Sequence, residues 1–332
     1  RREALRCIAS GEAQLVVGTH ALIQDAVAFH RLGLVVVDEQ HRFGVKQRLA
    51  LAETGESADV LLMSATPIPR SLALTLYGDL DLSVLDERPP GRQPVRTALR
   101  PESARPKVLD FIREQVAEGR QAYLVYPLVE ESEAMELKSA TEEYERLRSE
   151  VFPDLRLGLL HGQMPSEEKD RVMRSFAAGE IDVLVATTVI EVGIDVANAT
   201  VVVVEHAERF GLSQLHQLRG RVGRGAERSY CILLTTAEGA ERLHVFASTD
   251  DGFQIAEADM RLRGQGDLFG ERQSGLPAFR FADLERDLPL LDLARAEARA
   301  LVERDPALAE FPRYRDALAA RYGERARMYQ TG

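Results

Sequence analysis

Short runs of consecutive apolar residues recur along the chain and alternate with stretches of helical character. The runs cover residues 14–17, 34–37, 60–63, 122–125, 155–160, 183–185, 201–204 and 230–234. Strands that are apolar at consecutive positions are usually buried on both faces, as in a parallel sheet covered by helices. Parallel strands also need long crossover connections, which the helical stretches supply. The sequence therefore predicts an α/β fold with mostly parallel sheets.

Two of the intervening stretches have clear helix signals. Residues 103–118 place apolar side chains four apart and end at Gly119, and Pro165 opens a second helix that ends before Gly179. Glycine commonly follows the last residue of a helix, and proline commonly opens one. These stretches fit the crossovers that a parallel sheet needs.

The proline-rich segment at 86–94 is the clearest linker, because proline cannot continue a helix or a central strand. We expect a first domain at 1–90, a second at 91–236, and helices around a glycine-rich loop at 237–332. The first region holds about three of the apolar runs, so we expect it to be a truncated α/β domain. The second region holds five and reads as complete.

Composition limits the class of protein and its setting. The two cysteines, Cys7 and Cys231, are too few for a disulfide framework, which favours a reducing, cytoplasmic location. No apolar run approaches the ~20 residues of a membrane span. A net charge of −11 argues against indiscriminate binding to polyanions but leaves a local basic face open. Because the chain opens with Arg1 and Arg2 rather than Met, we expect it to be a fragment.

The run at 34–37 ends in two adjacent carboxylates, Asp38 and Glu39. Side chains at the carboxyl end of such a strand border the crevice where α/β sheets bind ligands. In a nucleotide site Asp38 would hold Mg²⁺, and Glu39 would orient and deprotonate the attacking water. The alternative is a pair of solvated acids in a turn. Partner segments elsewhere in the chain favour the nucleotide site.

The strongest partner segment spans residues 217–224 and reads Gln-Leu-Arg-Gly-Arg-Val-Gly-Arg. Guanidinium groups match phosphate oxygens bidentately, so Arg221 and Arg224 are candidate arginine fingers, with Gln217 sensing the same phosphate. An amphipathic helix with an exposed basic face is the alternative. The glycines argue against it, because each costs a helix interior about 1 kcal/mol relative to alanine.

Several further residues follow apolar runs and could contact ligands at the same sheet edges. Ser64 and Thr66 could couple the two domains, although Thr66 could equally cap a helix. Hydroxyl, imidazole and amide groups commonly contact the nucleic-acid backbone. The candidates for such contacts are Thr19, His20, His161, Thr187 and Thr188, and Gly193 and Asp195 could face the nucleotide ribose.

The phosphate-cradling pattern Gly-x-x-x-x-Gly-Lys-Ser/Thr does not occur in the sequence. That loop binds the phosphates in NTPases of this kind. We therefore expect these residues alone to hydrolyse ATP poorly.

Three long motifs together resemble the superfamily 2 DNA helicases of the RecG type. They are the Asp-Glu-Gln-His stretch that continues to Arg48, the Ser-Ala-Thr-Pro stretch at 64–67, and the segment 210–224. The resemblance continues through 251–256 and 272–275, a region also similar to the Mfd translocase.

The resemblance implies two RecA-like domains, the first truncated, and a helical translocation element that drives movement along duplex DNA and remodels forked or four-way junctions. It implies ATP and Mg²⁺ as cofactors and a monomeric motor in the bacterial cytoplasm. Gln40 and His41 would couple hydrolysis to motion, as would Arg263 and Gln273 in the translocation element. Arg263 could instead be a surface anchor. An Mfd-like transcription-repair translocase and a non-hydrolysing DNA-binding module are the alternatives.

Overall fold

The structure is a computed structural model, and it describes residues 2–23, 27–38, 58–64, 81, 83–85, 87, 93–127, 141–187, 195–236, 240–263 and 287–329. The chain divides into two compact units. One comprises Arg1–Ala65, Arg70–Asp81 and Phe269–Gly332, and the other Thr66–Pro69 and Leu82–Leu268. The boundaries expected from the sequence, after residues 90 and 236, stay predictions.

The first unit contains a two-stranded parallel sheet, β1 (Leu34–Val37) and β2 (Asp59–Leu62), paired from Leu34↔Asp59 to Val37↔Leu62. Its helical elements are α1 (Arg2–Ser10), η1 (His20–Ile23), α11 (Leu288–Arg304) and α12 (Pro312–Tyr329). Arg299 of α11 pairs with Asp81 at 3.1 Å.

Two expectations about the first unit are wrong. Residues 14–17 do not form a strand, and Leu15 is 85% exposed. β1 is not buried on both faces, since Leu34 and Val36 are about half exposed and only Val37 is buried. An apolar run becomes a doubly buried strand only where other strands and helices cover it, and a two-stranded sheet offers little such cover.

The second unit contains a six-stranded parallel sheet in the order β3-β8-β7-β4-β6-β5. The strands are β3 (Val95–Pro101), β4 (Gln121–Val125), β5 (Leu157–Leu160), β6 (Val183–Ala186), β7 (Ala199–Val204) and β8 (Ser229–Thr235). All five apolar runs expected in this region form strands, and β4, β6 and β7 are buried throughout. The predicted α/β class with parallel sheets is confirmed.

The edge strand β3 was not predicted. Its sequence, Val-Arg-Thr-Ala-Leu-Arg-Pro, has polar residues that interrupt any apolar run. As the outermost strand it pairs only with β8, so it does not need a doubly buried apolar surface. The apolar pattern used for the other strands therefore does not mark it.

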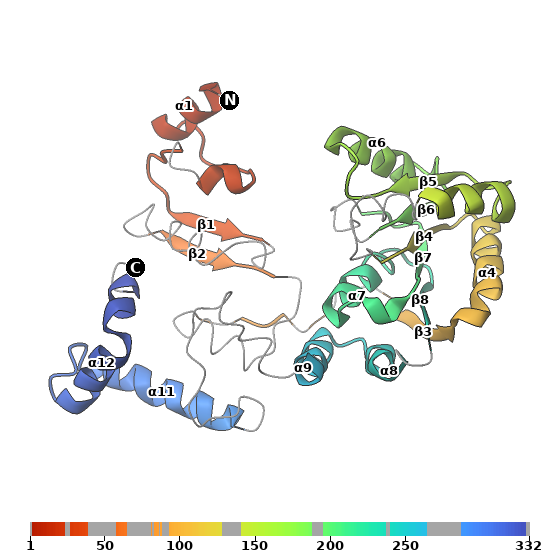
Figure 1. Cartoon of the computed structure of the whole chain (residues 1–332). Helices are drawn as coiled ribbons and strands as arrows, with labels where there is room; N and C mark the ends of the chain where they lie inside the picture. The colour runs from red at the N-terminus through yellow and green to blue at the C-terminus, as the bar shows by residue number, and fades with distance from the viewer. Residues whose placement is uncertain are drawn as a thin grey trace. The chain divides into compact units, whose positions relative to one another are not determined.

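Helices cover both faces of this sheet (Figure 1). On one face α4 (Arg105–Ala117) and η4 (Leu147–Val151) pack against Ala122 and Leu124 of β4. On the other, α6 (Ser166–Ala177), α7 (Leu212–Arg219), α8 (Ala240–Ser248) and α9 (Gly252–Arg263) share a core with Tyr123 and Val125. Successive residues of β4 thus point to opposite faces, as strand geometry requires.

The helix stops expected at Gly119 and Gly179 have the backbone conformation that favours glycine. Their φ angles are +82° and +75°, and α4 and α6 end two residues before them. Two shorter elements, η3 (Glu102–Ala104) and η5 (Ala207–Arg209), precede α4 and α7. Among the described helices, none has both the length and the apolar character to cross a membrane.

Candidate functional site

The carboxyl edge of the first unit's sheet carries two of the predicted residues. Asp38 follows β1 directly and is exposed, and Ser64 lies two residues beyond β2. The Met63 amide donates to the Val37 carbonyl at 2.8 Å, so the two strand ends are neighbours. Glu39, Gln40, His41 and Thr66 lie outside the described residues.

Thr19 and His20 do not follow a strand, because residues 14–17 do not form one. The exposed Thr19 precedes η1, and its carbonyl accepts a hydrogen bond from the Leu22 amide at 2.9 Å. The expected position of these two residues at a sheet edge is therefore wrong. Their predicted contact with nucleic acid is a separate matter and stays a prediction.

His161 and Thr187 meet at the carboxyl edge of the second sheet. They follow the paired strands β5 and β6, and the Thr187 amide donates to the Leu160 carbonyl at 3.1 Å. Thr187 is 3% exposed. Within the described part of the chain, Thr187 Oγ1 and His161 Nδ1 are buried without a hydrogen-bond partner. Burial, together with the charge of Lys169, lowers the pKa of His161, so its imidazole is neutral at pH 7. Thr188 lies outside the described residues.

The glycine and arginine segment forms a loop rather than a continued helix. α7 carries Gln217 and ends at Arg219, so the alternative of one helix through Arg224 is wrong. Residues 220–225, here called the arginine loop, follow it. Gly223 has φ +78°, and a Cβ there would lie 2.7 Å from Val95 Cγ2. A Cβ on Gly225 would lie 2.7 Å from the Ala197 carbonyl oxygen. Glycine therefore lets the loop approach β3 and the segment before β7.

The arginine loop brings three predicted residues together. Arg224 Nη1 lies 3.5 Å from Asp195 Oδ1, and Arg224 Nε donates to the Gly220 carbonyl at 3.0 Å. Burial raises the pKa of Tyr123 to about 12. The charges of Arg221 and Arg224 lower this pKa, and the charge of Asp195 raises it. The charges of Arg221, Arg224 and Asp195 therefore gather near the Tyr123 ring on the central strand. Gly193 lies outside the described residues.

Arg219 is a residue of this segment that the sequence reasoning missed. The sequence pattern assigned Arg219 no role between Gln217 and Arg221, yet this residue is 4% exposed and bonded to α8 and β3. A signal was available in the sequence. Arg219 stands seven residues after Leu212 and four after Leu215, which are both fully buried, so helical spacing places it on the apolar face.

Helices α8 and α9 make hydrogen bonds with α7 and with the residues just before it. Arg242 of α8 donates to the Glu208 and Phe210 carbonyls just before α7, at 2.8 and 2.5 Å. Ser213 of α7 donates to Asp259 of α9 at 3.3 Å. Arg263 is the last residue of α9, and Gln273 lies outside the described residues. The coupling role predicted for both stays a prediction.

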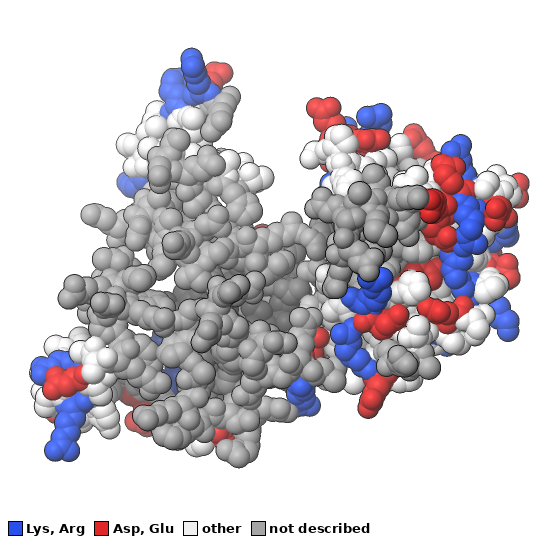
Figure 2. Space-filling model, in the orientation of Figure 1, with Lys and Arg blue, Asp and Glu red and all other residues white. Residues whose placement is uncertain are grey.

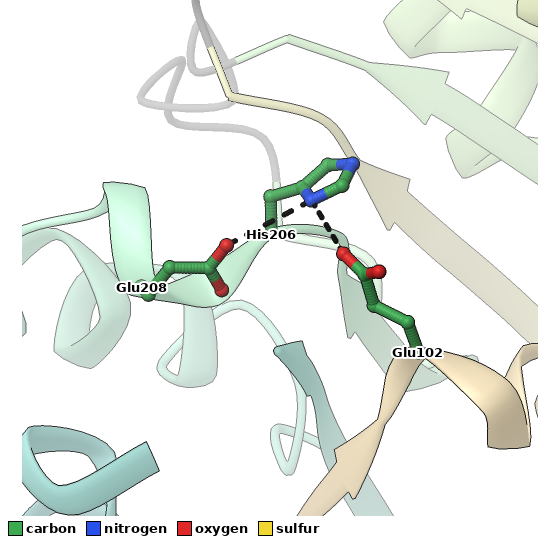
Figure 3. Close-up of side chains that lie close together, drawn as sticks. All are labelled: Glu102, His206 and Glu208. Carbon is green, nitrogen blue, oxygen red and sulfur yellow. Dashed lines mark ion pairs between the residues drawn. The ribbon is translucent and has the colours of Figure 1, made fainter. Parts of the chain in front are cut away.

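A group of acidic and imidazole side chains lies apart from the arginine loop. In the described part of the chain, Glu102, His206 and Glu208 offer possible metal ligands within 4.8 Å of one another (Figure 3). His206 Nδ1 lies 3.0 Å from Glu102 and 3.8 Å from Glu208. Glu102 and His206 are about half exposed. Exposed acidic groups commonly lie this close together without a metal ion, so we do not assign a metal site here.

The distribution of charge on the second unit's surface shows whether the net charge of the chain applies locally. On the face that Figure 2 shows, its described acidic and basic side chains are intermingled, so this face does not present one sign of charge. The overall charge of −11 therefore does not describe each local surface.

Three families match successive parts of the chain. "DEAD/DEAH box helicase" matches residues 1–75, "Helicase conserved C-terminal domain" matches 105–226, and "ATP-dependent DNA helicase RecG, domain 3, C-terminal" matches 249–318.

Relatives and one solved structure extend this likeness to nearly the whole chain. The ATP-dependent DNA helicases RecG of Synechocystis sp., Thermotoga maritima and Escherichia coli O157:H7 are 52%, 56% and 51% identical over 97%, 88% and 90% of this chain. The chain covers 39%, 38% and 44% of these proteins, or about two fifths of each. A structure of RecG bound to a three-way DNA junction is 51% identical with a TM-score of 0.66, over 88% of this chain and 38% of that one. Over the residues that it spans, the chain belongs to the RecG family of superfamily 2 DNA helicases.

Proposed function

We propose that this chain contributes the motor of an ATP-dependent DNA translocase that remodels forked and branched duplex DNA. The observation that carries the proposal is the likeness, at 51% identity over 88% of the chain, to a RecG structure bound to a three-way DNA junction. The gathering of Arg221, Arg224 and Asp195 supports it, because phosphoryl transfer needs positioned positive charge.

The first unit contributes the acidic half of the nucleotide site. Asp38 fits a magnesium ligand, since it is an exposed carboxylate at the carboxyl edge of a parallel sheet. Bound Mg²⁺ would neutralise charge on the phosphate oxygens. Asp38 would hold the metal, and Glu39 would accept a proton from the attacking water. Gln40, His41 and Ser64 of this unit, together with Thr66 of the second, would couple the two units.

The second unit contributes the basic half. Gln217, Arg221 and Arg224 bind the γ-phosphate, and an arginine finger typically raises turnover by ~10³ to 10⁵. Arg224 must first leave Asp195, whose side chain is 60% exposed. A solvent-exposed ion pair contributes only about 0–1 kcal/mol, so the exchange is easily driven by phosphate. Asp195, once released, is available with Gly193 for the ribose hydroxyls.

DNA lies along the carboxyl edges of the sheets. Thr187 and His161 donate to backbone phosphate oxygens once DNA binding uncovers them, because Thr187 Oγ1 and His161 Nδ1 are buried without a partner among the described residues. Thr19, His20 and Thr188 donate to the same backbone. Arg263 and Gln273 link that contact to domain closure. The motor acts as a monomer in the bacterial cytoplasm, a setting compatible with the two free cysteines. The 332 residues alone turn ATP over poorly, because they lack the phosphate-cradling pattern.

The experiment is an ATPase and fork-conversion assay on a protein of the family's full length that contains this chain. Forked DNA should stimulate ATP turnover more than linear duplex of equal length, and the fork should be converted to a four-way junction. DNA binding without ATP turnover would instead favour the non-hydrolysing module. ATP-driven displacement of stalled RNA polymerase, without fork conversion, would favour the Mfd-like alternative.

A further inference from the structure

We propose that Arg219 is a positioning residue for the arginine loop: its buried guanidinium fixes the end of α7 against α8 and β3, and thereby sets where Arg221 and Arg224 stand. The inference rests on the proposed function, in which those two arginines bind the transferring phosphate. Arg219 itself is 4% exposed and contacts α8 and β3, so we assign it no direct role in binding substrate.

The guanidinium of Arg219 is surrounded by acceptors from other elements. Its Nη1 donates to the Thr249 carbonyl at 2.9 Å and the Phe246 carbonyl at 3.2 Å, at the carboxyl end of α8. The same atom lies 3.4 Å from Asp250 Oδ1 and 3.4 Å from Thr97 Oγ1 on β3. A cation at this end of a helix bonds its last carbonyls and opposes the negative end of the dipole.

An aromatic contact completes the environment. The Arg219 guanidinium lies 4.3 Å from the centroid of the Phe246 ring, and Phe246 is fully buried. Cation–π attraction is strongest where both partners are removed from water. Arg219 therefore has polar partners at its edge and an aromatic ring against its face, which restricts both its position and its orientation.

The arginine loop begins directly after Arg219, the last residue of α7. The Val222 amide donates to the carbonyl of Arg219 itself at 3.3 Å, and the Arg221 amide donates to the Leu218 carbonyl at 3.0 Å. Val222 is fully buried, and Gly223 packs against Val95 of β3. The loop is thus tied at its start to the end of α7 and midway to β3, and Arg219 joins these two supports through Thr97.

The chemistry explains why arginine stands on an apolar face. Leucine there would fill the space but leave the Phe246 and Thr249 carbonyls without this donor. One nitrogen, Nη1, contacts α8 and β3 while the planar guanidinium lies over the Phe246 ring, and a lysine ammonium has no planar face to place there. A buried arginine at this point fits a role in positioning Arg221 and Arg224. Catalytic groups lose efficiency when they are displaced by about 1 Å.

The test compares four variants in a protein of the family's full length that contains this chain. Arg219→Met removes the donors, Arg219→Lys keeps the charge without the planar guanidinium, and Asp250→Asn weakens one contact. Arg171→Met, at an exposed position of α6, is the matched control for loss of one charge. The readouts are kcat and KM for ATP with forked DNA, fork affinity, and peptide-level hydrogen exchange.

Arg219→Met should lower kcat at least tenfold with KM and fork affinity within about threefold, because the loss falls on the transition state. Arg219→Lys should recover part of kcat, Asp250→Asn should lower it two- to fivefold, and the control should match the parent. Exchange should rise in peptides covering 216–224 and not in those of β4 and β7. If Arg219→Met fails to fold, Arg219→Lys and Asp250→Asn decide the question.

The inference is overturned if the folded variants keep kcat within twofold of the parent, or if exchange at 216–224 is unchanged. It is also overturned if exchange rises equally across the sheet, since Arg219 would then support the core in general. Failure of the proposed function looks different. The parent itself would then show no fork-stimulated turnover, while the exchange pattern would still report whether Arg219 holds the loop.

Discussion

The close approach of the arginine loop to β3 makes a measurable prediction at Gly223. An alanine there would keep φ near +78° and place its Cβ 2.7 Å from Val95 Cγ2. The left-handed conformation costs an L-residue about 1–2 kcal/mol, and forcing an extra methyl into a packed site typically costs about 1–3 kcal/mol. Valine relieves such a clash poorly, because its branched Cβ limits rotation. Gly223→Ala should therefore destabilise the fold by about 2–5 kcal/mol.

A matched control separates the two costs. Gly119 has φ +82° and nothing within 4 Å of the position of a Cβ, so Gly119→Ala carries only the conformational cost, about 1–2 kcal/mol. The assay is urea unfolding of each variant with equal m-values. In a Val95→Ala background, Gly223→Ala should cost no more than Gly119→Ala, because the clashing methyl is gone. Equal destabilisation by the two alanines in the parent background would refute the reasoning.

Three further predictions concern the proposed site and its unit. Glu39→Gln, in a protein of full family length, should keep ATP and fork binding and lower kcat at least a hundredfold; near-normal turnover would remove Glu39 from water activation. Asp195→Asn should leave Arg224 without its ion-pair partner and change the free energy of unfolding by less than about 1 kcal/mol, and a larger loss in urea unfolding would contradict a weak, exposed pair. Burial raises the pKa of Asp182, but hydrogen bonds from Arg156 outweigh it and lower the pKa overall. A lowered carboxyl pKa stabilises the fold above about pH 4 and loses that contribution as pH falls through the folded value. Asp182→Asn should therefore flatten the acid limb of stability below about pH 4, and an unchanged limb would refute this.

Strand prediction succeeded where burial was complete. The runs that became β4, β6 and β7 are apolar at consecutive positions because helices cover both faces of the second sheet. It failed at β3, where an edge position tolerates Arg96 and Arg100, and at residues 14–17, where an apolar run stays exposed. Periodicity reports what a segment could bury, and neighbouring elements decide whether it does.

Some features of the candidate site could likewise be predicted from the sequence, and others depend on contacts between distant segments. Asp38 after β1 and the paired positions of His161 and Thr187 follow from strand ends, which a sequence marks well. The end of α7 before the arginine loop follows from glycine, which is costly within a helix. The ion pair of Arg224 with Asp195 depends on a turn meeting a distant segment, and no local spacing predicts it.

The sequence by itself determined the α/β class, the parallel sheets and the residues able to handle phosphate, because these depend on runs and spacings within single elements. Only the tertiary structure decided which of the charged side chains are enclosed in the core and which stay nearer the surface. Arg219 and Arg221 stand two residues apart, yet the first is enclosed by Phe246 and the end of α8 while the second is half-buried near Tyr123. The physical reason is that burial and partner choice are properties of packed elements, which lie far apart along the chain.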